Sequence, residues 1–89
     1  MNIAILGSGG REHAIAWRVL KDREDIGVFV IPGNSGMELE ERIQCLEWDG
    51  EFSSLQTLLI SREIEFVIVG PETLLERGVT DFIEGLGVS

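Results

Sequence analysis

The sequence predicts an α/β domain with a three-layer parallel sheet, on three observations. Short apolar runs alternate with segments whose apolar residues recur at helical spacing, and each run stops at glycine or proline. The runs also carry almost no polar residues, which is typical of strands buried on both faces. Strands that alternate with helices form βαβ crossovers, so the strands are expected to be parallel.

The expected strands cover residues 2–6, 28–31 and 65–69, and residues 42–46 are expected to form a short edge strand. The second strand should end at Pro32, because proline and glycine do not continue a strand easily. Residues 32–36 are predicted to be a loop. The alternation predicts a further strand beyond Ser89.

Helical spacing predicts three helices between these strands. In the first, over residues 11–21, one stripe holds Ala14, Trp17 and Leu20 or Lys21, widened by Ala16 and Val19. The second carries Phe52, Leu55, Leu58 and Leu59, with Ser53 and Ser54 as possible N-caps. The third carries Val79, Phe82, Ile83 and Leu86, followed by Gly87 where a C-terminal capping glycine belongs.

The composition fits one small soluble domain and excludes several partners. The chain has 89 residues and a net charge of −9, which disfavours polyanionic nucleic acid and anionic membrane surfaces. The acids concentrated between Glu38 and Glu51 are expected to be a solvated surface. The single cysteine, Cys45, allows no internal disulfide and is expected to be a small strand or core residue. No signal or membrane-spanning pattern is visible, so a cytoplasmic location is expected.

Three loops should converge where the parallel strands end, which is where such sheets bind ligands. They are residues 7–12, 32–36 and 70–73. The glycines of the first loop permit a tight turn, and their N–H groups with the helix N-terminus favour an anionic or polar ligand. A tight turn that binds nothing explains the glycines equally well.

Common nucleotide motifs are absent. A dinucleotide fingerprint needs a small residue where Glu12 stands and an acid at the end of the second strand, where Asn34 follows instead. No Walker A loop is present, and the only lysine, Lys21, lies far down the first helix. His13 is expected to be structural. Glu12 suits either a helix cap or a ligand contact, and Arg11 either a phosphate or nearby acids.

The three loops together resemble the glycinamide ribonucleotide synthetases, also called phosphoribosylamine–glycine ligases. The matching segments are Gly7-Ser8-Gly9-Gly10-Arg11-Glu12-His13-Ala14 with Ala16-Trp17, then Pro32-Gly33-Asn34-Ser35-Gly36, then Val69-Gly70-Pro71-Glu72. The likeness extends from Met1 to about Gly87. The chain departs from the family at Met37, at Thr73-Leu74-Leu75 and at Glu76-Arg77, beside the predicted substrate contacts.

The resemblance implies a Rossmann-like, pre-ATP-grasp N-terminal domain over residues 1–89, with the first strand between the second and third. It implies an ATP-dependent ligase of purine biosynthesis whose central and C-terminal ATP-grasp domains, absent here, bind ATP and Mg²⁺ or Mn²⁺. This chain, without cofactor and inactive alone, would contribute to the 5-phosphoribosylamine site. The implied site residues are Gly7, Ser8, Gly9, Gly10, Arg11, Glu12, Pro32, Gly33, Asn34, Gly70, Pro71 and Glu72.

Within that implied site, the first loop would lie near the amine end or the phosphate, Asn34 would line the pocket and Glu72 would hold ribose hydroxyls. Which loop meets the phosphate is left open. Two other readings are a stand-alone module that binds a sugar phosphate or nucleotide without catalysis, and an interaction domain whose loops have lost their ligand.

Overall fold

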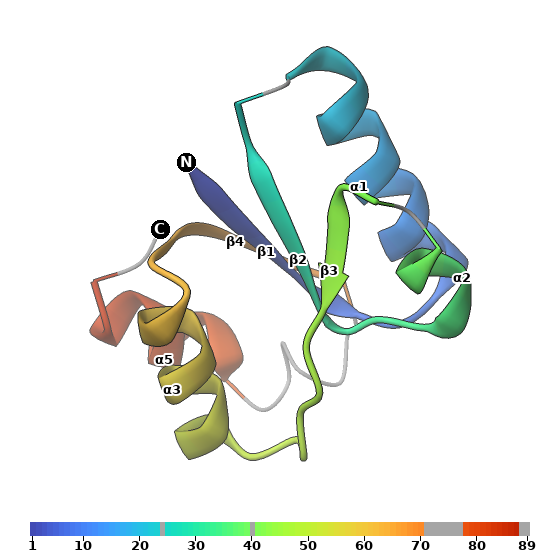
Figure 1. Cartoon of the computed structure of the whole chain (residues 1–89). Coiled ribbons are helices and arrows are strands. Elements are labelled where there is room, and N and C mark those ends of the chain that lie inside the picture. The colour runs from blue at the N-terminus through green and yellow to red at the C-terminus, as the bar shows by residue number, and fades with distance from the viewer. Residues whose placement is uncertain (24, 40, 71–77, 88–89) are drawn as a thin grey trace.

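The computed structural model of the chain describes residues 1–23, 25–39, 41–70 and 78–87. Strands and helices alternate along it as the sequence predicts (Figure 1). The elements are, in order, β1 (Asn2–Gly7), α1 (Gly10–Asp22), β2 (Gly27–Pro32), α2 (Ser35–Glu38), β3 (Ile43–Cys45), α3 (Phe52–Ser61), β4 (Ile64–Val69) and α5 (Val79–Gly85).

The described strands form one sheet in the order β3-β2-β1-β4, and every neighbouring pair is parallel. Strand β1 is central. It pairs with β2 from Asn2 opposite Gly27 to Gly7 opposite Pro32, and with β4 up to Leu6 opposite Val69. The predicted parallel sheet, the position of β1 and the short strand β3 are therefore confirmed, and the architecture is consistent with a Rossmann-like domain.

Helices cover both faces of the sheet, which explains why β1 and β2 are almost wholly apolar. The expectation of burial on both faces is wrong for β4, which ends the described sheet and is exposed at Glu65 and Phe66. Helices α1 and α2 lie on one face, and α3 and α5 on the other (Figure 1). Successive residues of a strand point to opposite faces, so Ile3 and Ile5 pack with Ala16 and Leu20 of α1. Two separate apolar clusters result. The second contains Ala4, Leu6, Phe29, Ile31, Leu46, Leu55, Leu59, Ile64, Val79 and Ile83.

The predicted apolar stripe of α1 is wrong in part. Ala16 and Leu20 are buried, but Ala14 is exposed and the Trp17 side chain remains 52% exposed. The sheet covers only one side of a helix, and here that side is centred on Ala16. Trp17 instead lies beneath Lys21, whose Nζ is 5.3 Å from the ring centroid. This spacing of four residues places both side chains on the same exposed helix face.

The predicted loop at residues 32–36 is also partly wrong, because β2 continues through Pro32 and α2 begins at Ser35. Asn34 is the N-cap of this short helix: its Oδ1 accepts a hydrogen bond of 3.0 Å from the Met37 N–H. The Met37 side chain is fully buried among the residues beneath α1. A one-turn helix with one buried residue leaves no periodicity to detect in the sequence.

Helix α3 is not capped by Ser53 or Ser54. Its N-cap residue is Glu51, whose side chain makes no capping bond. Asp49 supplies the carboxylate instead, accepting from the Glu51 N–H at 2.9 Å and from the Ser54 hydroxyl at 3.1 Å. At the end of α5, the predicted capping glycine is confirmed: Gly87 has φ +84° and its N–H donates to the Glu84 carbonyl at 3.0 Å.

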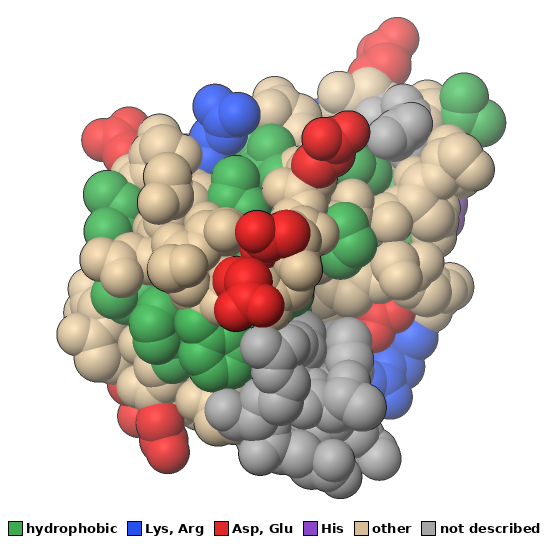
Figure 2. All heavy atoms as spheres, turned by 90° about the horizontal axis from the view of Figure 1, so that it is seen from below, with side chains coloured by type: hydrophobic (Ala, Val, Ile, Leu, Met, Phe, Trp, Pro, Cys, Tyr) green, Lys and Arg blue, Asp and Glu red, His purple; other side chains and the backbone are tan. Residues whose placement is uncertain are grey.

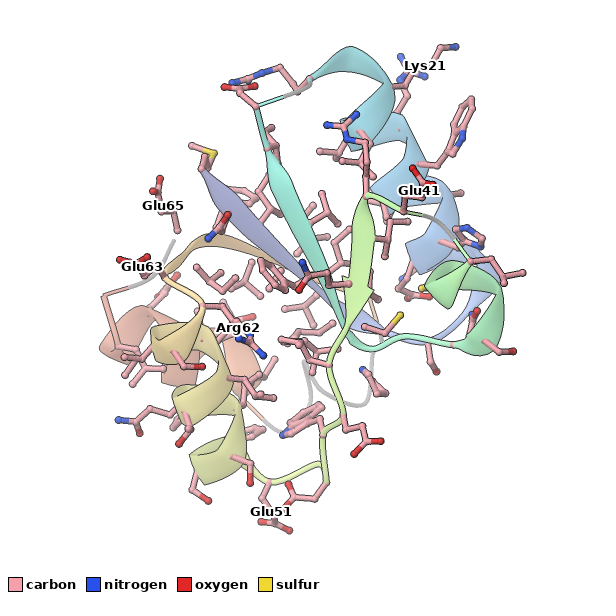
Figure 3. The ribbon with its side chains drawn as sticks, in the orientation of Figure 1. Lys21, Glu41, Glu51, Arg62, Glu63 and Glu65 are labelled. Carbon is pink, nitrogen blue, oxygen red and sulfur yellow. The ribbon has the colours of Figure 1, made fainter. Side chains whose placement is uncertain are left out.

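The described acids between Glu38 and Glu51 are exposed, as predicted for a solvated surface. Glu41 is exposed near β3, Glu51 lies at the lower end of the molecule, and Glu63 and Glu65 lie at its left edge (Figure 3). Exposure lets water screen the mutual repulsion of an acidic chain, so the excess charge does not oppose the packing of the two apolar clusters.

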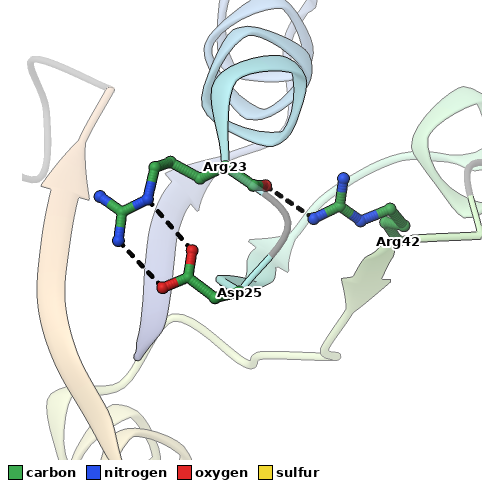
Figure 4. Close-up of polar contacts among 3 residues, drawn as sticks. All are labelled: Arg23, Asp25 and Arg42. Atoms are coloured by element: carbon green, nitrogen blue, oxygen red, sulfur yellow. Dashed lines mark hydrogen bonds and ion pairs between the residues drawn. The ribbon is translucent and has the colours of Figure 1, made fainter.

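The C-terminal end of α1 is fixed by two arginines (Figure 4). The Arg42 guanidinium donates to the Leu20 and Arg23 carbonyls at 2.9 and 2.8 Å, and a cation is favourable at a helix C-terminus. Arg23 forms a two-bond ion pair with Asp25, and this hydrogen bonding holds the pKa of the Asp25 carboxyl below its usual value. Both partners are exposed, so the pair contributes little to stability.

Candidate functional site

The predicted loops do meet at the carboxyl ends of the strands, as far as the structure describes them. The Gly33 N–H donates to the Gly7 carbonyl, and the Gly70 N–H donates to the Leu6 carbonyl, both at 3.0 Å. These bonds extend the parallel pairing of β1 with β2 and β4 beyond the strands. They fix the start of all three loops on one edge of the sheet. Pro71 and Glu72 of the predicted site lie outside the described residues.

Glu12 occupies the space between the first and third loops. The residue is only 6% exposed, and it is the one buried charged residue among those whose side chains the structure describes. Its Oε2 accepts a hydrogen bond of 3.0 Å from the Gly9 N–H, the reciprocal half of an N-terminal capping arrangement. A carboxylate in the first turn of α1 is also stabilised by the helix dipole.

Two glycines make room for the Glu12 side chain. A Cβ added at Gly70 would lie 1.9 Å from the Glu12 Oε1, and one added at Gly7 would lie 2.5 Å from the Glu12 Cγ. Gly7 also has φ +143°, a conformation that other residues rarely adopt. No positive φ is found at Gly70, so the contact with Glu12 is the reason for glycine at that position.

Arg11 joins the same two loops from the exposed side. Its Nη2 donates a short hydrogen bond to the Gly70 carbonyl, although the side chain as a whole is exposed. Two adjacent residues of α1 therefore contact Gly70 in different ways. Arg11 donates a hydrogen bond to the Gly70 carbonyl, and the Glu12 carboxylate occupies the space where a side chain at position 70 would be. The guanidinium is directed to protein backbone rather than to a nearby acid.

Asn34 connects the second loop to the first. Its Nδ2 donates to the Ser8 carbonyl at 2.6 Å, while its Oδ1 caps α2. Gly33 precedes it with φ +74°, and a Cβ at Gly33 would meet the Cys45 Sγ at 2.4 Å. Cys45 is half-buried, and its thiol lies 3.8 Å from the Asn34 carbonyl. This cysteine, at the end of β3, packs against the second loop, which is consistent with the prediction of a small strand or core residue.

A hollow opens beside these loops rather than over them. It has a volume of about 720 Å³, and its lining residues are Pro32, Glu47, Trp48, Asp49, Ser54, Thr57 and Leu58. Pro32 is the one residue it shares with the described part of the predicted site. Viewed from below Figure 1, toward the ends of the strands, acidic side chains lie near the centre of the surface (Figure 2). Trp48 and Thr57 belong to no recognisable motif, so nothing in the sequence marks them as pocket residues.

The described residues bear on metal and phosphate binding in two ways. They contain no group of three or more acidic, histidine or cysteine side chains placed to hold a metal ion. Lys21 lies in the last turn of α1, at the opposite end of the helix from the glycine loop. Within the described ranges, no helix is long and apolar enough to cross a membrane.

Comparison with known proteins identifies relatives along the entire chain. The family model for the phosphoribosylglycinamide synthetase N domain matches residues 1–89. Phosphoribosylamine–glycine ligases of Pseudomonas aeruginosa and Pasteurella multocida are 39% and 40% identical to 99% of this chain. A bifunctional purine biosynthetic protein of Dictyostelium discoideum is 36% identical over 99% of the chain. The chain spans only 20% and 21% of the two ligases and 11% of the bifunctional protein.

The two bonds of Asn34 predict a measurable contribution to stability. Asn34→Ala should lower the free energy of unfolding by about 1–3 kcal/mol, because it removes an N-cap and one further hydrogen bond. Asn34→Asp should lose about half as much, since it keeps the capping acceptor but cannot donate to Ser8. Urea denaturation measures both, with Gln56→Ala, an exposed amide on α3, as control. An Asn34→Ala variant as stable as this control would show that the two hydrogen bonds of Asn34 do not stabilise the domain.

Proposed function

Because the chain belongs to the phosphoribosylglycinamide synthetase N-domain family, we propose that it is the N-terminal domain of a phosphoribosylamine–glycine ligase. In the proposed reaction, the carboxylate of glycine attacks the terminal phosphoryl group of ATP, giving glycyl phosphate and ADP. The amine of 5-phosphoribosylamine then attacks the acyl carbon and releases inorganic phosphate. The product is glycinamide ribonucleotide, an intermediate of purine biosynthesis.

The proposed task of this domain is to contribute to the 5-phosphoribosylamine site. The observation that carries the proposal is the joining of the three loops at one edge of the sheet through the Gly33–Gly7, Gly70–Leu6 and Asn34–Ser8 bonds. Parallel sheets bind ligands at this edge. The loops are also the segments in which the sequence resembles the ligases most clearly.

The proposed roles of individual residues follow from their places in these loops. Ser8 and Gly10 are exposed at the start of α1, where they can meet the amine end or the phosphate of the substrate. Asn34 is half-buried beside them, and we propose that it lines the substrate pocket. Glu72, which follows Gly70 and Pro71, is proposed to accept hydrogen bonds from the ribose hydroxyls, because a carboxylate can accept from two neighbouring hydroxyl groups at once.

The chemistry of ATP and its divalent metal ion is proposed to occur on further domains. A metal-bound nucleotide would supply the phosphoryl group that activates glycine. The described residues offer no cluster for the metal, and Lys21 lies at the opposite end of α1 from the loops. The remaining domains of the ligase are the proposed partners of this domain, in the cytoplasm.

The proposal is tested by assaying a full-length protein that contains this domain beside the 89-residue chain alone. The full-length protein should release ADP and form glycinamide ribonucleotide only when ATP, glycine and 5-phosphoribosylamine are all present. The 89-residue chain should form none. Product formed by the short chain would show that the domain assignment is wrong. Ligand binding without any turnover by the full-length protein would favour a binding module.

Glu72 provides the corresponding prediction for a single residue. Glu72→Gln in the full-length ligase keeps the size of the side chain but removes its charge, which weakens its hydrogen bonds to hydroxyls. The kcat/KM for 5-phosphoribosylamine should fall by about tenfold or more, since a loss of ~1.4 kcal/mol corresponds to a factor of ten. The KM for ATP should not change. The matched control is Glu84→Gln, an exposed acid on α5. Unchanged 5-phosphoribosylamine kinetics would remove Glu72 from the site.

A further inference from the structure

We propose that Glu12 is a positioning residue, which locks the first and third loops together and does not itself contact the substrate. This inference rests on the proposed function and assigns a role within the same site. Its starting point is burial: Glu12 is 6% exposed although the residues that precede it in the sequence are open to solvent. Ser8, Gly9, Gly10 and Arg11 around it are all exposed.

The contacts of Glu12 are made to the protein's own loops. Its Oε2 accepts from the Gly9 N–H, so this N–H is directed to the carboxylate and not outward to a ligand. On the other side, its Oε1 lies where a side chain at Gly70 would begin. The carboxylate thus fixes the orientation of the Gly9 peptide and at the same time fills the space over Gly70.

Glycine at position 70 and glutamate at position 12 therefore depend on each other. An alanine at position 70 would place its Cβ 1.9 Å from the Glu12 Oε1, and the carboxylate would have to leave its place between the loops. The Gly9 N–H would lose its acceptor as a result. Glu12→Ala opens the same space but leaves that N–H without its partner, so the two substitutions disturb the loops through one shared contact.

A double-mutant cycle in the full-length ligase tests this dependence. Gly70→Ala and Glu12→Ala should each lower kcat/KM for 5-phosphoribosylamine by about tenfold or more, with the KM for ATP unchanged. The double variant should be no worse than the poorer single variant, because both act through one contact, whereas independent effects would multiply to about a hundredfold. Gly85→Ala is the control, since nothing lies within 4 Å of a Cβ built at Gly85.

The conservative variant separates positioning from substrate contact. Glu12→Gln keeps the volume and an oxygen that accepts from Gly9, so it should retain kcat/KM within about fivefold of the unmodified ligase, because one charge-assisted bond becomes a neutral one. A Glu12→Gln variant as impaired as Glu12→Ala would show that the charge contacts substrate and would overturn the proposal. Multiplicative losses in the cycle would also overturn it.

Thermal midpoints of the same variants distinguish this proposal from the proposed function. Gly70→Ala should lower the midpoint, and adding Glu12→Ala should lower it no further. If the full-length protein makes no glycinamide ribonucleotide, the ligase assignment fails. The thermal midpoints still show whether the Glu12–Gly70 contact exists. Coupled midpoints with unchanged kinetics in every variant would mean that Glu12 only stabilises the fold, and the positioning role would be wrong.

Discussion

The edge of the sheet where the loops meet depends on a buried carboxylate. Removing a carboxylate from water is costly unless it is hydrogen bonded. For Glu12 this desolvation cost is offset by the hydrogen bond from the Gly9 N–H and by the position of the residue in the first turn of α1. The glycine loop thus already holds an anionic group that belongs to the protein. Gly7 and Gly70 lack side chains where that group must fit, so two segments far apart in the sequence satisfy one steric and electrostatic requirement.

This arrangement gives the loops a fixed base. The central strand β1 carries the first loop, and its neighbours β2 and β4 carry the other two. Strands β1 and β2 are buried between two apolar layers, whereas β4 ends the described sheet and is partly exposed. Asn34 adds a side-chain bond between the first and second loops, as Glu12 and Arg11 add contacts between the first and third. A ligand at this edge would meet backbone that is held in place before binding, which reduces the ordering cost of association.

The strands could be predicted from the sequence because residues buried on both faces leave continuous apolar runs, as at β1, whereas the place of β1 between its neighbours was implied by the family resemblance. The contacts of individual side chains could not be predicted from the sequence. The exposed position of Trp17 depends on which side of α1 meets the sheet, and the cap at Asp49 depends on how the chain enters α3. Glu12 was recognised as either a cap or a ligand contact. Its contact with Gly70, 58 positions away, required the folded chain. The role of Glu72 stays a prediction, since it lies outside the described residues.

The central claim, that the Glu12 carboxylate holds the Gly9 peptide, is tested most directly by amide hydrogen exchange. In the unmodified protein the Gly9 N–H should exchange slowly for a residue so exposed, because it is bonded to the Oε2 of a buried side chain. Glu12→Ala should remove that protection, while Glu12→Gln should retain most of it. A Gly9 N–H that exchanges at the rate of an unprotected amide in the unmodified protein would contradict the account.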